Sequence, residues 1–332
     1  MNKIFQVNDY SPKFSGHETF PLRFGWLKKS YDAIERVTSN GESDNPFADN
    51  KAIANFGVGK NMVASMQHWA EATGLIFNNQ KIKKEAKKGF SNTWLAEALL
   101  DDNGFDPYLE NLATIWLLHW NLVSKPTYTT WFWAFSHFTL GSFDREQLLL
   151  SLSQLCADEG WSKRASLPTL KRDVDCFVRT YCSRPLKAGE PLDSSIDCPL
   201  AELNLLLPTG KRDGFRFNFG DKPSLTDACL AYIVFDYWRN VESGADAKVN
   251  SISLEALALA PGSPGQCLLL DADALTQRLE KLEETTAGDF WLDPSAGLKQ
   301  VRKKSPLSDE KLKAMLAQIY ENTAARGANY AA

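Results

Sequence analysis

The chain has 332 residues, of which 44% are hydrophobic and 11% aromatic, and its formal net charge is −4. These values exclude a disordered chain and a small single domain, and they predict two or three globular domains. The net charge argues against a protein that binds nucleic acid over its whole surface. Residues 1–100 nevertheless hold 13 Lys/Arg against 10 Asp/Glu, so any attraction for DNA is expected to be local.

The six cysteines, at positions 156, 176, 182, 198, 229 and 267, contain no CxxC pair. They are interpreted as buried, reduced thiols and not as a disulfide framework or a zinc site. The sequence shows no signal peptide and no apolar run near the roughly 20 residues that cross a bilayer. We therefore expect a soluble, cytoplasmic protein without a membrane partner.

The first dense motif is FSGHETFPLRFGWLKK, residues 14–29. His17 and Glu18 are the candidate catalytic residues, because such a pair can bind a metal or act as acid and base. The simpler alternative is that both side chains hydrogen-bond the backbone of a turn. Pro21 fits the first turn of a following helix. Three cations on the wetter faces of that helix are candidate DNA contacts: Arg23, Lys28 and Lys29.

Residues 50–73 predict two helices joined by a glycine turn, Phe56-Gly57-Val58-Gly59. The second helix is expected from Lys60 to Thr73. This is a helix-turn-helix pattern, in which exposed residues near the start of the second helix reach base edges. The candidate DNA contacts on its outer face are Lys60, Asn61, Ser65 and His68. The alternative is a helical hairpin buried in a larger domain.

A short apolar strand at residues 75–77 is followed by residues 78–89, which contain five lysines and one glutamate. In a winged helix this position belongs to the wing, and its lysines would contact phosphates. The candidate contacts are Lys81, Lys83, Lys84, Lys87 and Lys88. A solvated lysine-rich loop is the alternative.

Residues 112–138 predict two buried, aromatic helices that Pro126 separates. A second unit is expected from Asp144, with a helix over 145–157 and another that Ser166 caps. Residues 203–219 predict a short β-hairpin. Two cations on the capped helix are further candidate DNA contacts: Lys171 and Arg172.

Residues 253–301 again follow the order helix, turn, helix, hairpin, with one helix expected over 271–285. The fold class is therefore predicted as mainly α, with winged-helix or helix-turn-helix-like units and short β-hairpin wings around an aromatic helical core. The expected parts are an N-terminal winged-helix-like domain (1–140), a second unit (144–240), a third (245–305) and a helical or loose tail (306–332).

Several common catalytic motifs are absent from the sequence. Gly57-Val58-Gly59-Lys60 resembles the end of a phosphate-binding loop, but Ala54 replaces the first glycine and Asn61 the Ser/Thr that holds magnesium. No G-x-S-x-G, H-E-x-x-H or G-x-G-x-x-G occurs. The residues therefore support DNA binding better than they support catalysis.

Five segments together resemble a bacterial family catalogued as a domain of unknown function and associated with DNA phosphorothioation clusters. They are residues 14–29, 56–76, 112–124, 170–181 and 259–266, in the same order as in the family. The resemblance spans about residues 14–304. It is greatest to those family members that form one protein component of single-strand phosphorothioation systems. It implies a protein that engages or nicks DNA so that sulfur can replace a phosphate oxygen.

The resemblance implies DNA as a partner, together with the phosphorothioation proteins: a cysteine desulfurase, an ATPase and a phosphosulfate-reductase-like protein. Formation of a homodimer is left open as an alternative to a monomer. The expected function is DNA binding in phosphorothioate modification and phage defence, with metal-dependent nicking, which would need Mg²⁺ or Mn²⁺, left open. The alternative is a non-catalytic DNA-binding adaptor or transcriptional regulator with a winged-helix fold. A protein-binding scaffold would instead bind no DNA at low salt.

Overall fold

The computed structural model describes residues 10–41, 45–48, 50–82, 89–182, 198–210, 213–243, 249–295 and 298–330. The chain divides into two compact units. The first comprises residues 1–134 and 138–217, and the second residues 135–137 and 218–332. Each unit is described by itself.

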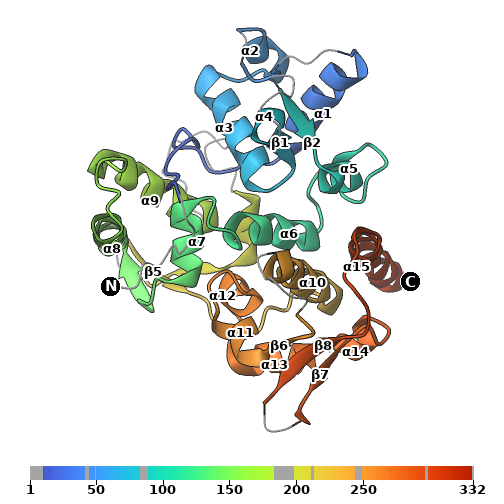
Figure 1. The fold of residues 1–332 in the computed structure, drawn as a ribbon. Helices are drawn as coiled ribbons and strands as arrows, with labels where there is room; N and C mark the ends of the chain where they lie inside the picture. The colour runs from blue at the N-terminus through green and yellow to red at the C-terminus, as the bar shows by residue number, and fades with distance from the viewer. Residues whose placement is uncertain are drawn as a thin grey trace. The chain divides into compact units, whose positions relative to one another are not determined.

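The first unit begins with four helices and two strands, drawn in blue to teal in Figure 1. These elements are α1 (Trp26–Ser39), α2 (Asn50–Phe56), α3 (Lys60–Ala72), β1 (Ile76–Asn78), α4 (Asn79–Ile82) and β2 (Phe90–Asn92). β1 and β2 are antiparallel, with Ile76 opposite Asn92. The two helices and the turn expected over residues 50–73 are therefore present.

The aromatic core of the first unit lies on α3, α6 (Leu112–Val123) and the start of α7 (Thr129–Ser136), and α5 (Trp94–Leu100) adds buried aliphatic residues. Trp116 and Trp120 of α6 are fully buried, as is Trp69 of α3. Asn111 caps α6 by accepting a hydrogen bond from Ala113 N–H. α6 is apolar on nearly all sides because protein surrounds it, as the sequence predicts.

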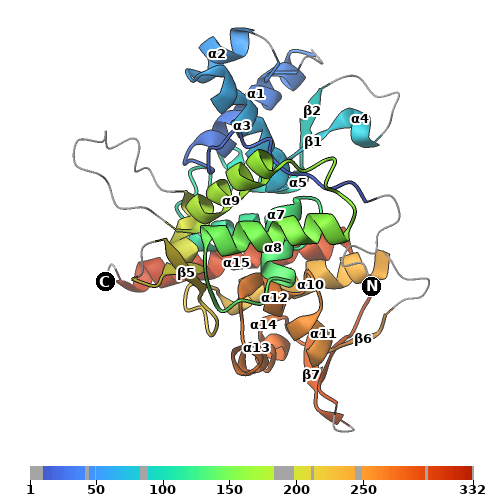
Figure 2. The same cartoon turned by 90° about the vertical axis from the view of Figure 1, so that its left-hand side faces the viewer.

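The first unit continues with β3 (Ser142–Asp144), α8 (Arg145–Asp158), α9 (Leu167–Tyr181), a 3-10 helix η2 (Pro199–Leu203), β4 (Leu206–Pro208) and β5 (Gly214–Phe217). Asp144 and Gln147 form a capping box at the start of α8, and Ser166 caps α9. α8 packs beside α9 (Figure 2). The strands form an antiparallel sheet in the order β3-β5-β4, so the expected hairpin gains a third strand.

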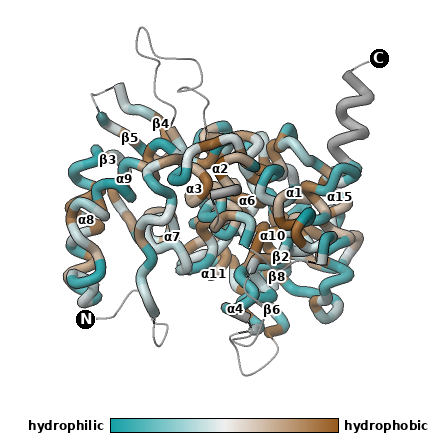
Figure 3. The backbone as a smooth tube through the Cα atoms, turned by 90° about the horizontal axis from the view of Figure 1, so that it is seen from above, coloured by the Kyte–Doolittle hydropathy of each residue, from teal (hydrophilic) through white to brown (hydrophobic). Residues whose placement is uncertain are grey.

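The second unit contains α10 (Asp227–Ser243), β6 (Ser251–Ser253), α11 (Leu254–Leu259), α12 (Pro264–Leu268), α13 (Ala272–Leu279), α14 (Leu282–Thr285), β7 (Phe290–Asp293), β8 (Gln300–Lys303) and α15 (Asp309–Tyr330). Its sheet has the order β6-β8-β7. α10 packs against α15 and carries a hydrophobic stretch, coloured brown in Figure 3. This stretch supplies the buried residues Ala228 to Phe235.

The mainly α fold with small antiparallel sheets is confirmed. The single helix predicted over 271–285 is wrong, because α13 ends at Leu279 and α14 begins at Leu282. A short-range bond from Lys281 N–H to the Arg278 carbonyl (3.1 Å) tightens the chain between them. No disulfide joins the six cysteines, which all lie among the described residues, and all but the half-buried Cys182 are buried. Among the described residues, no helix is both long and apolar enough to span a bilayer.

Candidate functional site

The turn between α2 and α3 presents the start of α3 to solvent. Gly57 has a φ of 66°, which favours glycine, and its N–H donates to the carbonyl of Ile53 at the end of α2. Lys60 and Asn61 are both exposed, as the helix-turn-helix pattern requires. Their role in DNA binding stays a prediction.

The outer face of α3 differs from the predicted one at two positions. Ser65 and His68 were expected to be exposed, but both are buried. The exposed or half-exposed face passes instead through Lys60, Ala64 and Gln67, which helical spacing places on one side. Gln67, a side chain able to hydrogen-bond a base edge, was missed. The polarity of Ser65 and His68 was misleading because both face a second, polar segment of the chain.

That segment is the turn at residues 14–20. Trp69 donates its indole N–H to the carbonyl of Phe20 (2.9 Å), and Ser65 Oγ lies 3.5 Å from the same oxygen. His68 lies so close to Gly16 that a Cβ at Gly16 would be 2.7 Å from His68 Nδ1. Burial lowers the pKa of His68 well below its usual range, with smaller contributions from His17 and Lys13. His68 is therefore neutral and carries no charge to offer a phosphate.

His17 is held on both sides of its ring. Its Nδ1 accepts a hydrogen bond from Thr19 N–H (3.0 Å), so Nε2 carries the proton and donates to Asp173 Oδ1 (2.8 Å). His17 and Asp173 are each 1% exposed. Asp173 also accepts from Ser15 N–H (2.9 Å) and from the Thr130 hydroxyl. The imidazole therefore has no uncommitted nitrogen for acid–base chemistry in this arrangement.

Glu18 is exposed and lies between residues that have unusual backbone conformations. The φ values of Ser15, Glu18 and Thr19 are 68°, 46° and 67°. The turn is held in place because Arg179 of α9 donates to the carbonyl of Thr19 (3.0 Å). The catalytic role predicted for His17 and Glu18 stays a prediction. The contacts of His17 match the simpler alternative, a histidine that hydrogen-bonds the backbone of a turn.

Of the other predicted cations, some contact neighbouring side chains, some are exposed, and the rest lie outside the described residues. Arg23 lies over the rings of Phe20 and Trp26, and Lys28 pairs with Asp32 (2.8 Å) and Asp102 (2.6 Å). Lys29 is exposed, with its Nζ 3.3 Å from the Phe56 carbonyl at the end of α2. Lys171 and Arg172 are exposed on α9. The wing candidates Lys83, Lys84, Lys87 and Lys88 lie outside the described residues, as does the side chain of Lys81.

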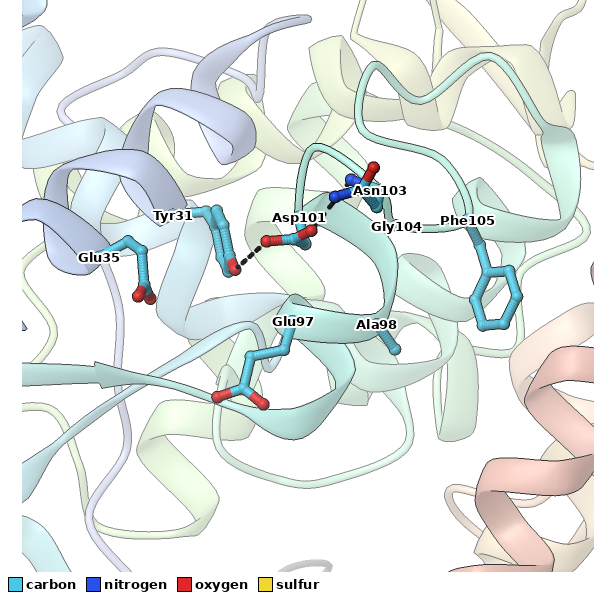
Figure 4. Close-up of a pocket in the computed structure, with 8 residues that line it drawn as sticks. All are labelled: Tyr31, Glu35, Glu97, Ala98, Asp101, Asn103, Gly104 and Phe105. Carbon is cyan, nitrogen blue, oxygen red and sulfur yellow. Dashed lines mark hydrogen bonds between the residues drawn. The ribbon is translucent and has the colours of Figure 1, made fainter. Parts of the chain in front are cut away.

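A pocket of about 510 Å³ lies between α1 and the end of α5 (Figure 4). It is lined by Tyr31, Glu35, Glu97, Ala98, Asp101, Asn103, Gly104 and Phe105. Tyr31 donates to Asp101 (3.4 Å), and burial together with the charge of Asp101 raises the pKa of Tyr31 to about 12. Three carboxylates repel phosphate, so this pocket is unsuited to a nucleic-acid backbone. It was not foreseen, because its lining residues come from distant parts of the sequence.

Within the described part of the chain, no group of three or more His, Cys, Asp or Glu residues is placed to hold a metal ion. The carboxylates of the acidic pocket are included in that statement. Mg²⁺ often binds through one or two carboxylates and completes its coordination with water and substrate phosphates. The described residues therefore contain no ready-made protein cage for a metal.

The family model described as "Protein of unknown function (DUF4007)" matches residues 14–320. A solved structure described as magnesium ion-bound SspB is similar, with a TM-score of 0.79 and 30% sequence identity. A second SspB crystal structure has a TM-score of 0.76 and 29% identity. Each alignment covers 94% of this chain and 89% of the other. No curated protein sequence matches the chain.

Proposed function

This chain belongs to the DUF4007 family, and we propose that it is a DNA-binding component of bacterial DNA phosphorothioate modification and phage defence. Its similarity to SspB structures supports membership of the same system. The proposed partners are DNA and the sulfur-transfer proteins of that system: a cysteine desulfurase, an ATPase and a phosphosulfate-reductase-like protein. Homodimerisation is a further part of the proposal.

The observation that carries DNA binding is a repeated order of elements. In the series β3, α8, α9, β4, β5, the first strand pairs with the last, which lies at the centre of the sheet. The series β6, α11 to α14, β7, β8 has the same pairing. The helices α1 to α3 followed by β1 and β2 share the order without the first strand. We interpret all three as winged-helix units, whose common use is to place a helix in the major groove.

The N-terminal series, α1 to β2, has in α3 a helix suited to contact with DNA. Lys60 and Asn61 stand exposed at the start of α3, and no carboxylate occurs between residues 50 and 70. Lysine contacts phosphates and asparagine can bind the edge of adenine. Lys29 adds a second exposed cation at the α2–α3 turn through its contact with Phe56.

Binding is tested by fluorescence anisotropy with a labelled duplex over a series of salt concentrations. We expect affinity to fall steeply with salt, and Lys60→Gln to reduce the slope of log K against log salt by about 1. Lys125→Gln, which removes an exposed cation elsewhere in the first unit, serves as the matched control and should leave the slope unchanged. No binding to duplex or single strand at low salt would refute the proposal.

Nicking is proposed as an additional activity, to be separated from binding by a second assay. Supercoiled plasmid is incubated with the pure protein, with Mg²⁺, with Mn²⁺ or without metal. Metal-dependent relaxation that Glu18→Gln abolishes, while binding persists, would support a nickase with its site near the N-terminal turn. Binding without relaxation would support the alternative, a non-catalytic adaptor or transcriptional regulator. Glu18 is the better probe because it is exposed, whereas His17 is buried.

A further inference from the structure

We propose that the beginning of α9 forms a second DNA-contacting surface, and that the turn at residues 14–20 fixes it relative to the start of α3. We call this surface the α9 patch. It consists of four exposed cations: Lys163, Arg164, Lys171 and Arg172. The inference rests on the proposed DNA binding and names a surface that acts beside Lys60 and Asn61.

The α9 patch is a local concentration of positive charge, which Asp158 and Glu159 precede along the chain. Residues 160–172 contain these four cations and no carboxylate. Of the nearest acids that follow, Asp173 is buried against His17, and Asp175 lies 3.3 Å from Arg145. The patch therefore presents positive charge to solvent, which is the electrostatic requirement for contact with a phosphate backbone.

The backbone beneath the α9 patch is ordered by its own hydrogen bonds. Trp161 N–H donates to the carbonyl of Cys156, and Arg164 N–H to the carbonyl of Trp161, each at 2.7 Å. The Ser166 side chain then caps α9. Leu167, the first residue of the helix, is 60% exposed. An apolar side chain at this place can contact a thymine methyl group, with the cations on phosphates to either side.

The series β6, α11 to α14, β7, β8 in the second unit provides a comparison within the same chain. Its helices α13 and α14 occupy the same place in the series as α9, but their exposed charges are mainly acidic: Asp273, Glu280, Glu283 and Glu284. The guanidinium of Arg278 is engaged by Asp221 (2.8 Å) and Asp227 (3.0 Å). The same topology thus carries opposite charge, and charge selects α9 over α13 for contact with DNA.

The turn at residues 14–20 contacts both α3 and α9. From α3, Trp69 donates to the Phe20 carbonyl. From α9, Asp173 accepts from His17 and Ser15, and Arg179 donates to Thr19. The two helices are therefore tied to one short, hydrogen-bonded segment. In this proposal the segment holds two DNA-contacting helices at a set spacing and is a positioning element.

The test compares full-length variants in the salt-dependence assay. Lys163→Gln/Arg164→Gln and Lys171→Gln/Arg172→Gln are each expected to weaken duplex binding and to reduce the salt slope by about 2, since each removes two phosphate contacts. Lys125→Gln is the control for loss of an exposed cation. Circular dichroism confirms that each variant is folded, which surface substitutions of this kind should allow.

A second measurement reports on the two surfaces acting together. Nuclease footprinting should give a shorter protected length for Lys171→Gln/Arg172→Gln than for the unmodified protein, because one of two contacts is lost. Both double variants could instead show the slopes, affinities and footprints of the unmodified protein, while Lys60→Gln still binds more weakly. That result would overturn the proposed role of the α9 patch and leave the proposed function standing. A wild-type protein that binds no DNA would overturn both.

Discussion

The buried carboxylate of Asp173 receives hydrogen bonds from Ser15 N–H, His17 Nε2 and the Thr130 hydroxyl. A buried charge keeps its desolvation cost when a partner is removed, so such groups are sensitive to substitution. His17 was singled out in the sequence for its chemistry. In the structure its two ring nitrogens secure a turn, and residue type alone could not distinguish these roles.

We predict that His17→Ala lowers the free energy of unfolding by about 2–4 kcal/mol, because Asp173 loses a buried donor. Urea denaturation followed by tryptophan fluorescence measures this change. Glu18→Gln, at the exposed neighbouring position, is the control and should change stability by less than about 0.5 kcal/mol. Equal stability of His17→Ala and the unmodified protein would contradict the structural role.

His68 predicts a pH dependence of stability. Burial lowers its pKa in the folded state, whereas the unfolded chain takes up a proton below about pH 6.5. The stabilisation is thus present above the unfolded pKa and is lost as pH falls, with a slope approaching about 1.4 kcal/mol per pH unit for this group. His68→Leu should remove that part of the loss between pH 7 and pH 5.5 in parallel urea titrations. Identical pH profiles of stability for His68→Leu and the unmodified protein would refute this contribution of His68.

At the scale of elements, α5 ends in a tightly packed turn at Gly104. A Cβ there would lie 2.6 Å from the carbonyl oxygen of Leu99 and 2.9 Å from that of Asp101. These atoms belong to backbone and cannot rotate away. The turn also positions Asp101 and Phe105 in the acidic pocket, so the glycine links a helix end to the shape of that pocket.

Gly104→Ala is expected to lower the free energy of unfolding by about 1–3 kcal/mol, because the added methyl group overpacks the turn. Gly141→Ala is the matched control. A Cβ at Gly141 meets no atom within 4 Å, and the residue is exposed. Thermal melting of both variants should separate them by several degrees. A common melting temperature would mean that the turn can relax around a side chain.

At the scale of the molecule, charge is distributed unevenly among units of similar topology. The net charge of −4 conceals a basic α9 patch and an acidic α13–α14 surface. Exposed charges are screened within about 10 Å at ordinary salt concentrations. Under the proposed function, local patches and not the net charge would therefore decide which surface contacts DNA.

This predicts that Lys281→Gln leaves the salt slope of DNA binding unchanged, because Lys281 lies among Glu280, Glu283 and Glu284 and its Nζ is 3.5 Å from the carboxylate of Asp227. Anisotropy titration beside Lys60→Gln measures the difference. A slope reduced by about 1 in Lys281→Gln would instead assign DNA contact to the α13–α14 surface.

Local signals in the sequence predicted most helices and the main turns. Ser166 caps α9 and Gly57 ends α2, and both act through bonds to residues a few positions away. The same local patterns placed Lys60 and Asn61 at an exposed helix start. The resemblance to a phosphorothioation-associated family is supported by the DUF4007 match and the SspB structures. The winged-helix identity and the four-part domain division remain predictions.

Only the tertiary structure decided which polar residues are buried. His17 and Asp173 are 156 residues apart, and Ser65 and His68 of α3 lie against the turn at residues 14–20. Helix caps and glycine turns are encoded by neighbours along the chain, so the sequence by itself determined them. Burial and pairing between distant residues depend on how the whole chain packs, so no local pattern could reveal them.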